Sequence, residues 1–117
     1  MSMPWPLVLL NTIMGVGSAA AAGAAVARPR LLAPHDGTDR DDRFYPSMYA
    51  ARSIPLGLMV TAVVWLEPVP LTPLVLIVAA LAQLADTAIG LSHRLTGMAV
   101  GAAIAAACHI AGALVLL

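Results

Sequence analysis

Residues 73–91 read PLVLIVAALAQLADTAIGL, an apolar stretch in which Asp86 is the one charged residue. A helix rises 1.5 Å per residue, so about twenty residues cross the ~30 Å hydrocarbon core of a bilayer. The stretch has this length and few groups that water would have to solvate. We therefore predict a transmembrane helix here.

Three further apolar stretches of similar length lead to the same prediction. We expect helices at about 6–27, 45–66, 73–91 and 95–117. The composition agrees, because 61% of the 117 residues are hydrophobic and 10% are charged, whereas roughly 25% are charged in a soluble domain. The predicted fold class is all-α, a four-helix transmembrane bundle that forms a single domain over residues 1–117.

The segments between these helices differ in length and polarity. A polar loop is expected at 28–44, and prolines hold the short link at 67–71 out of helix. Thr72 followed by Pro73 resembles an N-cap with proline at the first helical position. Adjacent spans joined by such short links are expected to be antiparallel.

The arginines predict an orientation in the cell membrane. Four lie in the first loop and one in the third, namely Arg28, Arg30, Arg40, Arg43 and Arg94. Loops rich in arginine stay on the cytoplasmic side. Both termini of this multi-pass protein are therefore expected outside the cytoplasm.

Small residues recur at helical spacing in the first and last spans. The first span carries Gly15, Ser18, Ala19, Ala22 and Gly23, and the last carries Gly97 and Gly101. This spacing lets membrane helices approach closely. It predicts either close packing inside the bundle or a homodimer through the first or the fourth helix.

Several classes of partner are not expected. The formal net charge is zero and the chain has no lysine, so it lacks the basic surface of a nucleic-acid-binding protein. The aspartates of the first loop do not have the spacing of a calcium-binding loop. We predict no metal site and no cofactor, with the lipid bilayer and a lipophilic small molecule as partners.

Ionisable residues inside the spans are candidates for a functional site, because a charge near the bilayer centre costs several kcal/mol without a partner. Arg52 and Asp86 each lie about 10 Å from the same membrane surface by helical rise. We predict that they pair and act as the catalytic residues. The structural alternative is that Arg52 reaches the lipid headgroups and Asp86 only links helices.

Further polar residues share helix faces with this pair. Gln83 lies on the face of Asp86, and Tyr45 and Tyr49 lie on the face of Arg52. All three are predicted to bind substrate. Pro55 frees the carbonyl of Ala51, which is expected within reach of the guanidinium.

Asn11 and His109 are expected to form a second polar layer. Both lie roughly 20–25 Å from the expected cytoplasmic surface, so they are close enough in depth to touch each other. We include both among the candidate substrate-binding residues. The alternative is that they only hydrogen-bond between helices, and direct contact between His109 and Asp86 is not expected.

Part of this pattern resembles a known family. The run 49–57 (YAARSIPLG), the run 83–86 (QLAD) and His109 resemble a family of small four-helix membrane proteins of bacteria and fungi, described as a domain of unknown function. The resemblance covers most of the chain after about residue 40. It implies the four-helix fold and the polar site, and members resembling it occur beside small-molecule biosynthesis genes.

Three functional hypotheses follow. The first is an intramembrane site that binds or transforms a lipophilic small molecule, for example an isomerase, cyclase or epoxide-opening enzyme with Asp86 as general acid or base. The second is a small homo-oligomeric transporter or efflux subunit, similar in length and helix number to the small multidrug exporters. Those proteins use a glutamate in their first helix, where this chain offers Asn11, and Asp86 is the residue that could substitute for it. The third is a non-enzymatic partner subunit, which a lack of any cavity beside Arg52 would favour.

Overall fold

The computed structural model describes residues 2–28, 44–66 and 70–117. Within them the chain forms four helices and no strand: α1 (Trp5–Ala27), α2 (Phe44–Trp65), α3 (Thr72–Ser92) and α4 (Thr96–Leu116). Every helix boundary lies within one residue of its prediction. The all-α four-helix fold is confirmed, while most of the predicted loop at 28–44 lies outside the described residues.

The predicted N-cap of α3 is wrong. Thr72 is already helical and Leu71 occupies the cap position, with no side-chain hydrogen bond to the helix start. The Thr72 hydroxyl instead donates to the carbonyl of Val63 on α2, at 3.5 Å. Because Thr72 is buried against α2, its side chain faces that helix and is not available to cap α3.

The turn between α3 and α4 reverses the chain tightly. The Leu95 amide donates to the Gly90 carbonyl at 2.7 Å, and Arg94 adopts a positive φ of 58°, as in the capping motifs that end many helices. A Cβ on Gly90 would lie 3.0 Å from the backbone nitrogen of Ala99. Gly90 therefore lets α4 fold back closely along α3.

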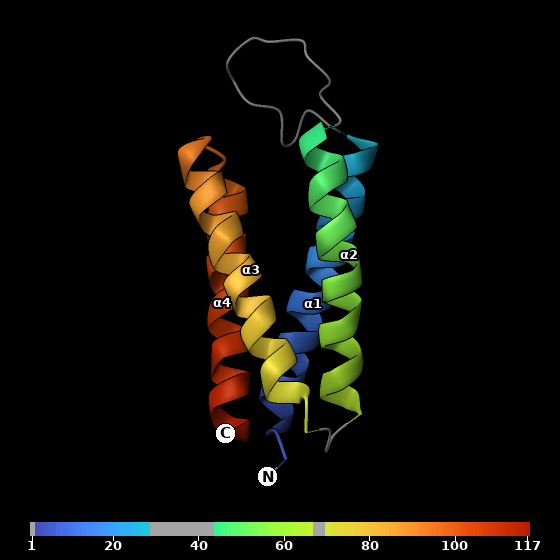
Figure 1. Cartoon of the computed structure of the whole chain (residues 1–117), viewed down its shortest axis with the longest axis vertical. Helices are drawn as coiled ribbons and strands as arrows, with labels where there is room; N and C mark the ends of the chain where they lie inside the picture. The colour runs from blue at the N-terminus through green and yellow to red at the C-terminus, as the bar shows by residue number, and fades with distance from the viewer. Residues whose placement is uncertain (1, 29–43, 67–69) are drawn as a thin grey trace.

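The four helices form two hairpins. α1 packs mainly on α2, and α3 packs mainly on α4, with smaller contacts between the pairs. Figure 1 shows the hairpins close together at the end that carries both termini and apart at the end where α1 stops and α2 starts. We call these the termini end and the loop end of the bundle.

The apolar core lies at the termini end. It is formed by Met3, Val60, Val64, Leu76, Ala79 and Ala113. These residues come from α2, α3, α4 and the segment before α1, so burying them joins the two hairpins. The loop half lacks such a cluster among the described residues, and there polar side chains connect the hairpins.

The outer surface of the bundle is apolar. Large side chains such as Leu9, Leu58, Leu81 and Leu114 are exposed, and each of the four helices is long and apolar enough to cross a membrane. Helices satisfy their own backbone hydrogen bonds, as a lipid environment requires. The bundle thus has the apolar outer surface of a protein that contacts the acyl chains of a lipid bilayer.

Candidate functional site

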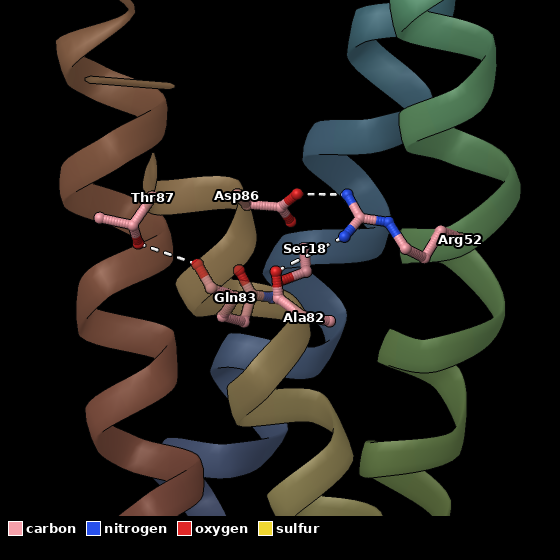
Figure 2. A network of polar contacts seen from close by, with 6 residues as sticks. All are labelled: Ser18, Arg52, Ala82, Gln83, Asp86 and Thr87. Atoms are coloured by element: carbon pink, nitrogen blue, oxygen red, sulfur yellow. Dashed lines mark hydrogen bonds and ion pairs between the residues drawn. The ribbon is translucent and has the colours of Figure 1, made fainter. Parts of the chain in front are cut away.

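An ion pair joins the two hairpins in the loop half of the bundle. The Arg52 guanidinium of α2 donates through Nη2 to Oδ1 of Asp86 on α3 (Figure 2). The Arg52 side chain is 40% exposed, whereas that of Asp86 is 3% exposed. The predicted contact is therefore present, with the carboxylate buried and the guanidinium covering it.

The expected contact of the guanidinium with the Ala51 carbonyl is replaced by another. Arg52 Nη1 donates to the carbonyl of Ala82 on α3, at 3.5 Å. The side chain extends away from its own helix to reach Asp86, so the nearest carbonyl acceptor is one turn along α3. Both hydrogen bonds of Arg52 consequently tie α2 to α3.

Gln83 makes a second link between the hairpins. Its Nε2 donates to the hydroxyl of Ser18 on α1 at 3.1 Å, and its backbone carbonyl accepts from Thr87 Oγ1 at 2.8 Å (Figure 2). Gln83 and Asp86 are both buried, as expected for a face that looks into the bundle. From the sequence, Ser18 was expected only to allow close packing. Its hydroxyl group was the feature that could have predicted the hydrogen bond to Gln83.

Two adjoining cavities lie beside these polar residues. Their volumes are about 420 and 280 Å³, and Tyr49 and Gly97 line both, while Ser18 and Gln83 line the second. We call them together the interhairpin cavity. Tyr49 therefore lies where a bound molecule would touch it, whereas the side chain of Tyr45 lies outside the described residues.

Glycines form part of the wall of this cavity. A Cβ added at Gly17, Gly97 or Gly101 would meet nothing within 4 Å. The predicted close packing through Gly97 and Gly101 is therefore wrong within the chain, because the hairpins diverge where these residues lie. Gly15 behaves as predicted, since its Cβ would lie 2.7 Å from the Gly57 carbonyl of α2.

Asn11 and His109 form the second polar layer. His109 Nδ1 lies 2.7 Å from Asn11 Oδ1. Asn11 Nδ2 donates to the carbonyls of Leu7, at 2.9 Å, and of Cys108, at 3.2 Å. The expected contact is present, and no hydrogen bond joins His109 to Asp86 among the described residues.

These features define the chain as a multi-pass α-helical membrane protein with polar groups buried between its helices. No family model, curated protein or solved structure matches it. The resemblance to the family of small four-helix membrane proteins, and the catalytic and substrate-binding roles of the site residues, stay predictions. In the part of the chain that the structure describes, no group of three or more His, Cys, Asp or Glu could hold a metal ion.

Proposed function

We propose that the protein binds a lipophilic small molecule that carries a hydrogen-bonding group, in the interhairpin cavity. The observation that carries this proposal is the cavity itself, with parts of about 420 and 280 Å³, the larger of which lies in the size range of small-molecule sites. Its walls include Met98, Ala21 and several glycines, which suit an apolar body.

The polar end of such a molecule would meet Tyr49, Ser18 and Gln83. These three side chains line the cavity and offer hydroxyl and amide groups, a small polar set within an apolar pocket. The Arg52–Asp86 pair joins the two hairpins nearby, since Asp86 shares one face of α3 with Gln83. Catalysis by Asp86 as general acid or base, with Arg52 stabilising an oxyanion, stays a prediction.

Two observations weigh against the alternatives. A partner subunit was expected to lack any cavity beside Arg52, yet Arg52 lines one small cavity and the interhairpin cavity lies next to it. The small multidrug exporters use a glutamate in their first helix, whereas Asn11 is uncharged and uses both ends of its amide in hydrogen bonds; proton coupling in this chain would have to use Asp86 of α3 instead. Homodimerisation through α1 or α4 remains a prediction.

Gly97→Leu is expected to abolish binding by filling the cavity. Gly97 lines both parts of the cavity, and a Cβ there meets no other atom. The added side chain should therefore occupy ligand space without displacing a helix. With parinaric acid, a fluorescent fatty acid, as the probe, we expect saturable binding to the purified protein and at least a tenfold loss in the variant, equivalent to about 1.4 kcal/mol.

Gly23→Leu is the matched control. Gly23 is also a helical glycine with open space in front of it, but it lines neither part of the cavity. Binding by this variant should equal that of the natural chain. Equal loss in both variants, or no saturable binding by the natural chain, would contradict the proposal.

The orientation belongs to the same proposal. Both termini lie at one end of the bundle (Figure 1), and Arg28 and Arg94 lie at the other. With the arginines on the cytoplasmic side, a peptide tag on either terminus should be digested by protease added outside intact cells. Protection of both tags until the cells are lysed would reverse the orientation.

A further inference from the structure

A small cavity adjoins the ion pair and shares Ser18 and Gln83 with the wall of the interhairpin cavity. Its volume is about 10 Å³, close to the least that holds one water molecule. All four helices contribute to its wall, and the polar residues there are Ser18, Arg52, Ser53, Gln83, Asp86 and His109. It is the place where the Arg52–Asp86 layer and the Asn11–His109 layer meet.

The hydrogen bonds of Asn11 define the protonation of His109. Asn11 Nδ2 donates to two backbone carbonyls, of Leu7 and Cys108, which can only accept. This assigns the other end of the amide as oxygen, which can only accept as well. The hydrogen in the 2.7 Å contact between His109 Nδ1 and Asn11 Oδ1 therefore belongs to the histidine, and in the neutral ring Nε2 is a bare acceptor.

His109 Nε2 has no hydrogen-bond donor among the described residues. The residue is 1% exposed. Every fully buried side-chain nitrogen or oxygen in this part of the protein has a hydrogen-bond partner. Because Nε2 has no partner, it cannot be fully buried, so the small exposed surface of His109 includes this atom. The cavity that His109 lines is the one of 10 Å³. A buried acceptor left without a donor costs about 1–3 kcal/mol, which a water molecule in the cavity would offset.

We propose that this cavity binds one water molecule that bridges His109 to Gln83 and Ser18. Gln83 uses its Nε2 to donate to the Ser18 hydroxyl, so its Oε1 is available to accept and the Ser18 hydrogen is available to donate. The water donates to His109 Nε2 and Gln83 Oε1 and accepts from Ser18. Three hydrogen bonds are the usual number for a buried water.

The bridge makes the two polar layers one hydrogen-bonded unit. It extends from Asn11 through His109 and the water to Gln83, one turn from Asp86 on the same face of α3. On the other side of His109, Asn11 fills the space and is itself fully buried. A proton added to the neutral imidazole would therefore reach Nε2 through the water, from the side of the ion pair.

Solid-state NMR of the full chain in lipid bilayers, with ¹⁵N-labelled histidine, tests this site without any ligand. His35 and His93 are assigned by substitution with glutamine. We expect His109 to carry its hydrogen on Nδ1, and we expect magnetisation to pass from a bound water to the unprotonated Nε2. A hydrogen on Nε2 with a bare Nδ1, or no transfer from water, would overturn the proposal.

Gln83→Met removes one partner of the water at nearly constant side-chain length. The transfer from water to His109 should fall at least twofold in this variant. Thr87→Val is the matched control, because Thr87 lies one turn along the same helix but does not line the cavity. If transfer in Gln83→Met stayed at the level of the natural chain, Gln83 would not contact the water. If both variants lost transfer equally, the cause would be a change in α3 as a whole. Each result would contradict the proposed bridge.

Discussion

Gly57→Val is expected to force α1 and α2 apart and so to destabilise the bundle. A Cβ at Gly57 would overlap the carbonyl oxygen of Gly15 and lie 3.3 Å from the backbone nitrogen of Ala19. Both atoms belong to the backbone of α1, so the strain can be relieved only by moving the helix. We expect a loss of about 3 kcal/mol in the free energy of unfolding, the upper end for overpacking.

Tryptophan fluorescence during unfolding in detergent measures this loss. Trp65 of α2 donates through its indole nitrogen to Thr12 of α1 at 2.9 Å, so its emission reports separation of the two helices. Gly23→Val is the control, because a Cβ there meets nothing within 4 Å, and its unfolding should change by less than about 0.5 kcal/mol. A stable Gly57→Val protein would mean that α1 and α2 do not cross at Gly15.

Arg52→Ala is expected to destabilise the bundle by about 2 kcal/mol. Removing one member of a buried ion pair typically costs 3–5 kcal/mol because the other charge stays buried. The cost is smaller here, since the Arg52 side chain is 40% exposed while that of Asp86 is 3% exposed. Arg28→Ala, which changes an exposed arginine at the end of α1, should have little effect on unfolding.

A double-mutant cycle separates the pair from its surroundings. The double variant Arg52→Ala/Asp86→Ala should lose less unfolding free energy than the two single variants lose together, and the difference, the coupling energy, should be about 1–2 kcal/mol. Strict additivity in the unfolding free energies would indicate that Arg52 faces the headgroups in the membrane. In that case Arg52 and Asp86 would not form a functional site, and Asp86 would only link helices.

The helices could be predicted because each one obeys a local requirement. A span must be apolar for about twenty residues, and prolines or charges interrupt the apolar stretches where the structure has turns. The contact between Arg52 and Asp86 could also be predicted, since a charge inside a span needs a partner and depth along each helix follows from the residue count. The same count placed Asn11 beside His109.

The cavities could not be predicted, because they depend on how the hairpins lie relative to each other. Gly15 and Gly97 belong to the same kind of small-residue pattern, yet a neighbouring helix covers one and open space faces the other. The difference arises because the core at the termini end brings the hairpins together there and leaves them apart at the loop end. Side-chain spacing along one helix holds no information about that divergence.

Local composition therefore established the number of helices, their limits and the polar residues that need partners, because lipid penalises each exposed polar group wherever it lies. Helix crossing decided the rest: Ser18 as the partner of Gln83, the acceptor of Arg52 on α3 and the space lined by Tyr49. These features depend on the rotation and separation of helices distant in the chain, which arise from the packing of all four together.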